Sequence, residues 1–478
     1  MIRRRRYGTR RWPYGALLVA GLLVAACAPA PEGLEFPPSR EDGGSDAPSA
    51  AVEECPAEAV PPAQDRPLIS LQFSLAENLR IVTGTEQVRF TPDLPTDELV
   101  FRLIPNSPLS APFGNLLTIT DVSGEQVSDY GYESADAYPT TPGGLLVVEL
   151  EDEVAAGDSV EVLLNFELEL GDGTFDRFGT ADGLSWWGSG YPLLSWEPGV
   201  GWSRDQLVTL SGETSTSQAA DTTISVEAPE DLEVLMTGDQ DRPEPAGDGR
   251  RIWTSTEAAA RDVSVAAGQF DTADAAAGDT EITVGVLPDA DADAAELAQD
   301  AASIIEEFEE FFGPFPYDTL SIPVLPDFGG GIEYPSSILL ATSQRFILVH
   351  EIAHMWFYGM IGNSQFRDPW LDEAFASYAE VLVDASAPDS TDLRTPGDIG
   401  GSMADFPDTD EYFSVVYGKG RAALVTAREA AGPAAFDAGL RCYINSQAWQ
   451  IAVPGDVAVA FADLPEALRI LEEAGAFR

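Results

Sequence analysis

The sequence predicts an α+β multidomain protein in which an antiparallel β-sandwich or saddle domain precedes a mainly α-helical domain. The chain has 478 residues, which is more than one hydrophobic core usually serves. Short runs of β-branched and aromatic residues fill residues 67–275, whereas apolar residues at helical spacing dominate residues 276–478. Apolar residues make up 44% of the chain, so most of it can fold.

Residues 1–26 have the composition of an export signal of the lipoprotein type. Six arginines come before a short apolar run over 16–26, and this run is too short to cross a bilayer. The run is followed by a cysteine, so the letters VAAC end at Cys27 and resemble the bacterial lipobox, in which the cysteine is lipidated. We therefore expect an exported lipoprotein anchored to the membrane, with a plain secretory signal as the alternative.

Residues 27–66 predict a disordered tether that begins at the lipidated cysteine. They are rich in proline and acidic residues and contain one aromatic residue, Phe36, a composition that cannot bury a core. Outside the cytoplasm, Cys55 and Cys442 could form a disulfide, and two free thiols are the alternative.

Residues 67–275 contain the predicted strands. Clusters of Gly, Pro, Asp and Asn separate these runs, at the spacing expected of an antiparallel sandwich or saddle. No catalytic cluster is evident in this region, so we expect it to form the scaffold and one wall of a substrate cleft. The clearest runs are 68–73, 86–90, 145–150, 160–166 and 223–226.

The periodicity changes after an alanine- and aspartate-rich stretch at 271–280, which we take as the domain boundary. Apolar residues between Leu297 and Phe312 recur at helical spacing and stop at Gly313, which predicts a helix. The remainder of the chain is predicted to be mainly helical, with strand-like runs at 320–325 and 338–341.

The chain is strongly acidic, with 80 Asp and Glu residues against 26 Lys and Arg residues and a formal net charge of −54. Such a field repels phosphate backbones and excludes nucleic acid as a partner. Lysine occurs once, at Lys419, and histidine twice, at His350 and His354. The acidity suits high external salt, where self-repulsion is screened, and a genome biased towards acidic codons is the alternative.

The segment His350-Glu351-Ile352-Ala353-His354 predicts a metal site on a buried helix. On a helix, residues four apart share a face, so both imidazoles can bind one ion with Glu351 beside it. Apolar residues flank the segment on both sides, and a buried histidine or glutamate is costly unless it is paired or binds a metal. Because the chain has no other histidine, two core histidines arranged by chance are a poor explanation.

A catalytic zinc ion usually has three protein ligands and one open position, and segment 368–375 can supply the third. Asp368 is a suitable N-cap and Pro369 a suitable first helical residue, which would place Glu373 early in a second helix. Eighteen residues separate His354 from Glu373, enough for the second helix to return antiparallel to the first. The rival carboxylates are Asp368, Asp372 and Glu380.

Three motifs together resemble those of the aminopeptidase N family of zinc metallopeptidases, the gluzincin aminopeptidases. In that family H-E-x-x-H is followed, after eighteen residues, by a glutamate in W-L-x-E-x-F-A, and this chain has such a segment at 370–376. The family's G-x-M-E-N signature is matched in part at 330–334, which read GGIEY. Its Y-x-K-G motif is matched at 417–420, which include the only lysine.

The resemblance covers residues 67–478 and implies a thermolysin-like catalytic domain that binds one Zn²⁺ per chain. Its ligands would be His350, His354 and Glu373. Glu351 would act as the general base toward a water molecule that the metal acidifies, and would later deliver the proton to the leaving amine. Tyr417 would stabilise the oxyanion of the transition state.

The resemblance also implies that Glu333, together with Gly330 and Gly331, binds the free α-ammonium group of a peptide. Glu333 follows three glycines and precedes a proline, so we expect its backbone on a turn that an extended peptide can approach. Ile332 and Tyr334 stand where the signature has Met and Asn. We identify no second amine-binding Glu or Gln in the β-rich region and expect no large C-terminal helical domain.

These implications predict an enzyme that releases N-terminal residues from peptides outside the cytoplasm. A zinc endopeptidase of the thermolysin type is the first alternative, and it would not need Glu333 and would cut N-acetylated peptides. The second alternative is a catalytically silent, surface-anchored binding protein on a peptidase fold. Glu351 argues against this second alternative, because a binding protein has no use for a base beside the metal.

Overall fold

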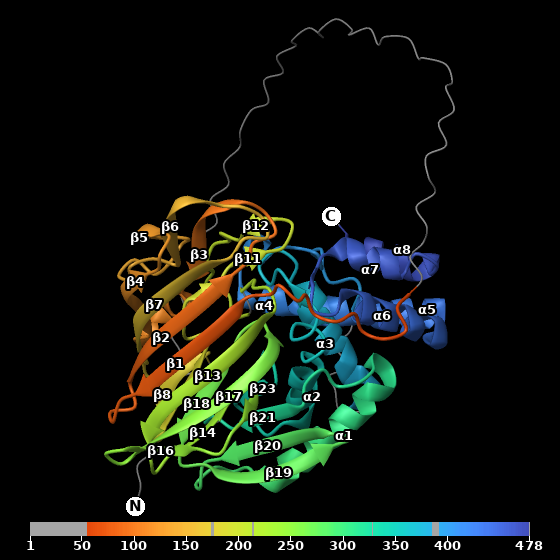
Figure 1. Ribbon diagram of the computed structural model, residues 1–478. Helices are drawn as coiled ribbons and strands as arrows, with labels where there is room; N and C mark the ends of the chain where they lie inside the picture. Colours follow the sequence, from red (N-terminus) through yellow and green to blue (C-terminus); the bar gives the residue numbers. More distant parts are fainter. Residues whose placement is uncertain (1–54, 174–175, 213–214, 327, 385–391, 478) are drawn as a thin grey trace, which may run out of the picture. The chain divides into compact units, whose positions relative to one another are not determined.

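The computed structural model describes residues 55–173, 176–212, 215–326, 328–384 and 392–477 (Figure 1). The predicted export signal, the predicted lipidation site Cys27 and residues 28–54 of the predicted tether lie outside this part of the chain. Within the described ranges, no helix combines the length and the apolar character that crossing a membrane requires.

An eight-stranded sheet is the largest element of the β-rich region. Its strand order is β15-β17-β13-β1-β2-β7-β4, and β16 pairs with β17. β1 runs antiparallel to β2 and parallel to β13. The strands are β1 (Leu68–Leu75), β2 (Ile81–Phe90), β4 (Leu116–Ser123), β7 (Val160–Glu169), β13 (Ala220–Pro229), β15 (Asp239–Gln240), β16 (Glu244–Gly247) and β17 (Arg250–Ala260).

Two four-stranded sheets share a hydrophobic core with the large sheet. Their strand orders are β10-β3-β6-β5 and β14-β18-β9-β8, and β11 pairs with β12. The strands are β3 (Thr96–Arg102), β5 (Val127–Glu133), β6 (Leu145–Val154), β8 (Phe178–Ala181), β9 (Leu184–Gly188), β10 (Leu193–Leu194), β11 (Trp196–Glu197), β12 (Gly201–Trp202), β14 (Glu233–Met236) and β18 (Ser264–Gly268). Two short 3₁₀ helices, Ile104–Asn106 and Ala111–Phe113, accompany them.

The predicted β-rich region is confirmed. All five predicted runs lie within strands β1, β2, β6, β7 and β13. Side-chain burial alternates along β7, because successive side chains of a strand point to opposite faces and only one face meets the core.

A five-stranded sheet opens the second region, with the order β19-β20-β21-β23-β22. The stretch 271–280 that suggested a domain boundary forms β19 and the turn into β20. Both runs predicted as strands in this region are strands β21 and β23. The bounds are β19 (Asp271–Ala277), β20 (Thr280–Val286), β21 (Thr319–Pro323), β22 (Gly331–Tyr334) and β23 (Ser337–Leu340).

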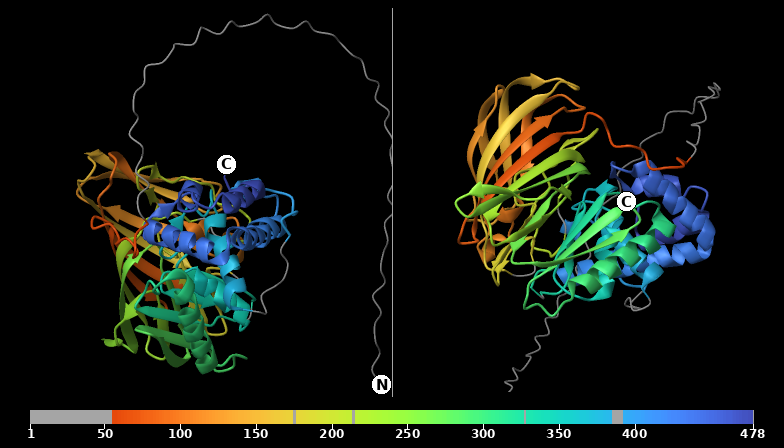
Figure 2. Two further views of the ribbon diagram at one scale, coloured as in Figure 1. Left: turned by 90° about the vertical axis from the view of Figure 1, so that its right-hand side faces the viewer. Right: turned by 60° about the horizontal axis from the view of Figure 1, so that its bottom comes forward.

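Helix α1 (Ala294–Phe312) packs on β19 and β20, and Figure 2 shows it alongside these strands. It begins after Asp293, whose carboxylate accepts hydrogen bonds from the backbone N–H groups of Ala295 and Glu296, as an N-cap should. It ends at Gly313, as predicted from the sequence. Its buried face consists of the apolar residues that recur at helical spacing.

The rest of the second region is mainly helical, which confirms the predicted α+β organisation. The remaining helices are α2 (Arg345–Ala353), α3 (Trp370–Val383), α4 (Thr409–Tyr412), α5 (Gly420–Ala431), α6 (Pro433–Gln447), α7 (Pro454–Ala460) and α8 (Pro465–Ala474). A 3₁₀ helix spans Met403–Asp405, a π-helix, η4, spans Phe413–Lys419, and the short strands β24 (Gly362–Asn363) and β25 (Ile451–Ala452) pair in parallel.

The buried side chain of Arg261 joins the two regions. It follows β17 and donates hydrogen bonds to the backbone carbonyls of Gly359, Met360 and Gln450 over 3.3, 3.1 and 2.7 Å. The planar guanidinium has five N–H groups, so one side chain can satisfy several carbonyls. The loop that follows α2 is thereby held against the β-rich region.

A disulfide connects Cys55 with Cys442 on α6, and their Cα atoms are 5.4 Å apart. Beside it, the Asn445 side-chain amide donates to the carbonyl of Pro56 over 3.0 Å, and the Asn445 carbonyl accepts from the N–H of Val60 over 2.9 Å. Of the two thiol states that the sequence left open, the structure therefore adopts the bonded one.

Candidate metal centre and active site

Helix α2 supplies both predicted histidines. His350 lies in its last turn, and His354 is the C-cap residue, still in a right-handed helical conformation. The two rings therefore remain on one face, with centroids 4.7 Å apart. The helix ends at Ala353, before the end of the apolar run that flanks the two histidines in the sequence. It ends there because the chain turns away after His354.

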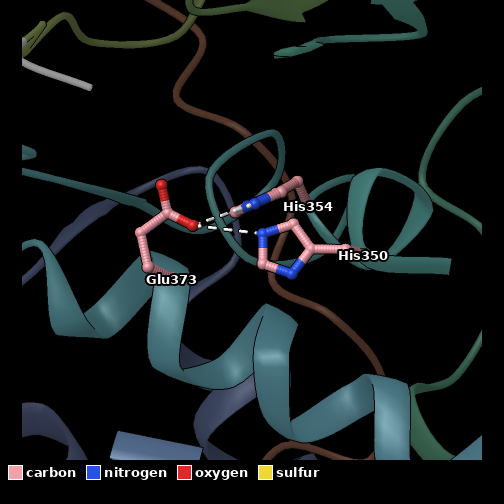
Figure 3. A group of neighbouring side chains, drawn as sticks. All are labelled: His350, His354 and Glu373. Atoms are coloured by element: carbon pink, nitrogen blue, oxygen red, sulfur yellow. Dashed lines mark hydrogen bonds and ion pairs between the residues drawn. The ribbon is translucent and has the colours of Figure 1, made fainter. Parts of the chain in front are cut away.

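Helix α3 brings Glu373 to the two histidines (Figure 3). Its Oε2 lies 3.2 Å from His350 Nε2 and 3.4 Å from His354 Nε2. One ligand atom from each of the three residues lies within 4.8 Å of the other two. Burial alone would raise the pKa of Glu373, but hydrogen bonds from His350 and His354 lower it.

The start of α3 differs slightly from the prediction. The helix begins at Trp370 and Pro369 is its N-cap, without a side-chain capping bond. Asp368 therefore does not cap the helix with its carboxylate; its backbone carbonyl accepts from the Leu371 N–H over 3.1 Å. Glu373 still lies in the first turns, so the predicted ligand position is unaffected.

Two of the rival carboxylates lie beside the other ring nitrogens of the histidines. Glu380 Oε1 forms a hydrogen bond with His350 Nδ1 over 2.9 Å. Asp372 Oδ1 lies 2.6 Å from His354 Nδ1, but the hydrogen bond of that nitrogen goes to the backbone carbonyl of Phe357 over 3.0 Å. Partners of this kind set the tautomer and the ring orientation of metal-binding histidines, leaving Nε2 to the ion. Glu380 also pairs with Arg421 on α5 over 3.0 Å.

The chemistry of this donor set fits a zinc ion. Two imidazole nitrogens and one carboxylate oxygen converge, which is the ligand set of catalytic zinc sites. Five buried carboxylates surround the two rings, and a divalent cation would offset their charge. These carboxylates are Glu333, Glu351, Asp372, Glu373 and Glu380.

Glu351 lies next to the two histidines and against the backbone of β22. It is 4% exposed, and its Oε2 has no hydrogen-bond partner among the described residues. Burial raises the pKa of Glu351 to about 7, and the positive charge of His350 and His354 limits the rise. A Cβ atom on Gly331 would lie 2.5 Å from Glu351 Cγ, so glycine is needed there for the Glu351 side chain to fit.

Glu333 lies on β22, the edge strand of the five-stranded sheet. The expectation of a turn at Glu333 was wrong, because backbone pairing of β22 with β23 extends through Glu333 opposite Ile338. The turn comes later, at Ser336, whose φ is 51°. Burial raises the pKa of Glu333 to about 8, and His354 opposes the rise while Asp372 adds to it.

The glycines before Glu333 shape the approach to β22. Gly329 and Gly330 have φ angles of 79° and 106°, a left-handed conformation that favours glycine. The Gly330 carbonyl accepts from the Ala341 N–H over 2.9 Å. Gly331, the first residue of β22, lies against the side chain of Glu351.

Tyr334 stands where the family signature has Asn, and neighbouring residues of the β-rich region accommodate the larger side chain. Its hydroxyl accepts a hydrogen bond from Arg177 over 3.1 Å. A Cβ atom on Gly188 would lie 2.1 Å from the same hydroxyl oxygen. The larger side chain thus fits because glycine stands opposite.

Tyr417 is presented to the site by the π-helix η4, an element that is frequent at functional sites. Its ring stacks on His350 with centroids 5.7 Å apart and an interplanar angle of 9°. Burial, followed by the charge of Glu373, raises the pKa of its hydroxyl. The neighbouring Lys419, predicted to belong to the same motif, donates to the carbonyl of Gly397 and so anchors the π-helix.

These residues line a cavity of about 1000 Å³. Its walls include Glu333, Glu351 and Tyr417 from the helical region and Arg177 and Ser211 from the β-rich region. A cavity of about 1130 Å³ elsewhere on the molecule contains none of the predicted site residues.

Several residues of this site were not singled out from the sequence. Gln365, Arg421 and Tyr412 carry no local signal, because each reaches the site through tertiary packing. Glu380 had a detectable signal: it follows Glu373 by seven residues, two helical turns on the same face. It was weighed only as a rival ligand.

Comparison with known proteins identifies the same region. Residues 296–399 match the peptidase family M1 domain. The chain is 26% identical over 200 residues to tricorn protease-interacting factor F2 of Thermoplasma acidophilum, which is 34% of this chain and 26% of that protein. It is 29% identical over 191 residues to aminopeptidase N of Lactobacillus helveticus, covering 32% and 22% respectively. The matched part thus spans about a quarter of these relatives.

The fold extends the likeness over most of the chain. The crystal structure of an M1 zinc metallopeptidase from Deinococcus radiodurans superposes with a TM-score of 0.64 at 16% identity, covering 86% of this chain and 94% of that one. Residues 296–399 thus match the M1 peptidase domain, and the chain has the fold of an M1 zinc metallopeptidase. Its zinc site consists of His350, His354 and Glu373.

Proposed function

We propose that this protein is a zinc aminopeptidase that releases single residues from the free N-termini of peptides. The observation that carries the proposal is the position of Glu333. It is a buried carboxylate on an edge strand, in the same cavity as the zinc ligands and Glu351. A carboxylate there can pair with the α-ammonium group of a peptide, which is cationic below its pKa of about 7.7–8.0.

The reaction follows from what each residue can do. Zinc, when bound, supplies a Lewis acid that polarises the scissile carbonyl and acidifies water. Glu351 takes the proton of the attacking water and delivers it to the leaving amine. The hydroxyl of Tyr417 donates to the developing oxyanion. Glu333 holds the amine end, so the bond that is cut lies one residue from the N-terminus.

The edge of β22 supports this arrangement. β22 pairs with β23 on one side only, so its other side offers backbone groups to an extended peptide. A peptide laid along that edge would run from Glu333 past Glu351, which lies against Gly331. Such a register would place its N-terminus at Glu333.

The test compares blocked and free substrates. Wild-type protein loaded with zinc should cleave a peptide with a free N-terminus strongly in preference to its N-acetylated form, because an unpaired buried charge at Glu333 costs about 2–5 kcal/mol. Glu333→Ala should erase this preference and Glu333→Asp should keep part of it. Equal cleavage of both peptides by the wild type would favour the thermolysin-type endopeptidase, and no cleavage of either would favour the silent binding protein.

We further propose that the enzyme acts outside the cytoplasm as a lipoprotein anchored through Cys27. The arginine-rich start, the apolar run and the letters VAAC support this location, and a disulfide between Cys55 and Cys442 suits an oxidising compartment. Cell fractionation of the wild type and Cys27→Ala tests the anchor. The variant should leave the membrane fraction, and equal membrane retention would overturn the proposal.

A further inference from the structure

The side chain of Gln365 lies between the β-rich region and the metal centre. It is 1% exposed and belongs to the loop between β24 and α3. Its Nε2 donates to Asp372 Oδ2 over 2.9 Å and to Glu333 Oε1 over 3.5 Å. Its Oε1 accepts from the N–H and the hydroxyl of Ser215 over 3.1 and 2.7 Å.

These contacts use the full hydrogen-bonding capacity of the amide. A glutamine side chain has two N–H donors and two acceptor lone pairs, and here each has a partner. A flipped amide would set its carbonyl oxygen against the carboxylates of Asp372 and Glu333. Ser215, which comes from the β-rich region, therefore dictates that the donor end of Gln365 faces the metal centre.

The two carboxylates that Gln365 bridges act on different parts of the proposed reaction. Asp372 lies 2.6 Å from Nδ1 of the zinc ligand His354, and Glu333 is the proposed amine-binding group. One ligand atom each of Glu333, His354 and Asp372 lies within 4.8 Å of the other two. Carboxylates this close repel one another, so donors placed between them hold both in position.

We propose that Gln365 is a positioning residue that fixes Glu333 relative to the zinc site and thereby sets the preference for free N-termini. Ser215 makes this preference depend on the β-rich region. The inference rests on the proposed aminopeptidase function, and it assigns the selectivity to a contact outside the family motifs.

The experiment uses the full chain and measures the ratio of kcat/KM for a free peptide to that for its N-acetylated form. Gln365→Met keeps the length of the side chain and removes both donated bonds. We expect its ratio to fall about tenfold or more, the range typical of lost partners around a metal site. The change should appear mainly in KM of the free peptide, because Glu333 pairs with the substrate before reaction.

Two further variants keep the test decisive if Gln365→Met folds poorly. Ser215→Ala removes one of the two bonds that orient the amide and should lower the ratio about threefold. Thr216→Val is the matched control. It removes the neighbouring contact between the regions, Thr216 Oγ1 to Ser364 Oγ at 3.3 Å, without touching Gln365, and should leave the ratio unchanged.

The outcomes separate this inference from the proposed function. Should Gln365→Met and Ser215→Ala slow both peptides equally at full zinc content, Gln365 has only a structural role and the inference is overturned. Should the wild type itself cleave both peptides equally, the proposed function fails first. In that case a zinc competition titration still tests the contact between Gln365 and Asp372. Weaker zinc binding by Gln365→Met would support a role for this contact, and unchanged zinc binding would overturn it.

Discussion

The β-rich core and the metal centre each bury a glutamate that lacks a full set of hydrogen bonds, and the two glutamates differ in what surrounds them. Glu86 on β2 is 0% exposed, and no described residue forms a hydrogen bond with either of its carboxylate oxygens. Glu351 on α2 is 4% exposed, and one of its two carboxylate oxygens has no such partner.

The surroundings decide how each group titrates. Burial raises the pKa of Glu86 well above its ordinary value, and no neighbouring charge opposes the rise. Burial raises the pKa of Glu351 to about 7 only, because His350 and His354 favour its charged form. Burial therefore favours the protonated form of Glu86 without opposition, whereas the charge beside Glu351 keeps the pKa of that group near neutrality.

This difference indicates how a buried acid could act as the base that we propose Glu351 to be. Burial by itself keeps the proton in place, and a carboxylic acid that keeps its proton cannot accept another. Burial beside positive charge produces a group whose pKa is close to the working pH, as general catalysis requires. A zinc ion bound to His350 and His354 requires their Nε2 atoms to be unprotonated, so the charge of the ion would take the place of theirs in favouring the carboxylate form of Glu351.

The largest expected effect comes from Glu351→Gln. The amide has the same shape but cannot take a proton, so kcat should fall by about 10²–10⁴ or more. Zinc content should remain at one ion per chain, because Glu351 is not a ligand. Metal analysis and turnover of an aminoacyl reporter, made on the same sample, check both statements.

The matched control is Glu86→Gln, which makes the same chemical change in the β-rich core. Its turnover should equal that of the wild type. A zinc-loaded Glu351→Gln protein that remains active would mean that another group handles the proton.

The zinc ligands could be predicted from the sequence because their information is local. His350 and His354 are four residues apart on one helix, and Glu373 follows at a spacing that lets a second helix return. Gln365 could not be predicted, because its role depends on Ser215, 150 residues away. Spacing along the chain says nothing about which loop of another region will contact it.

The fold shows the same division between local and tertiary information. Strand runs and helix α1 follow from periodicity and turn residues, and they lie where predicted. The backbone at Glu333 was expected to turn because glycines precede it and Pro335 follows. Pairing of Gly331 with Leu340 across β22 and β23 overrides that local preference, and the turn moves to Ser336.

A smaller effect is expected from Tyr417→Phe. The change removes the hydroxyl that we propose donates to the oxyanion, so kcat should fall by about 10²–10³ with little change in KM. Steady-state kinetics with a free peptide measure both constants. Tyr378→Phe on α3 is the control, since its hydroxyl has no partner among the described residues. A change confined to KM would assign Tyr417 to substrate binding instead.

The smallest effect concerns stability and comes from Glu86. In the unfolded chain a glutamate loses its proton near pH 4.3, whereas burial keeps Glu86 protonated to higher pH in the folded protein. Between these two pKa values unfolding releases a proton, so the free energy of unfolding falls by about 1.4 kcal/mol per pH unit from this group. This contribution to stability is fully present below the unfolded pKa and is lost as the pH rises to the folded pKa.

Glu86→Gln cannot titrate, so comparing it with the wild type isolates this group whatever the amide itself does to stability. The free energy of unfolding of the variant relative to the wild type should therefore rise as the pH increases above the unfolded pKa of about 4.3. Urea unfolding followed by tryptophan fluorescence at several pH values measures the difference. Parallel pH profiles would mean that Glu86 titrates alike in the folded and unfolded chains. The difference between Glu86 and Glu351 would then lie in their hydrogen bonds and not in their pKa values.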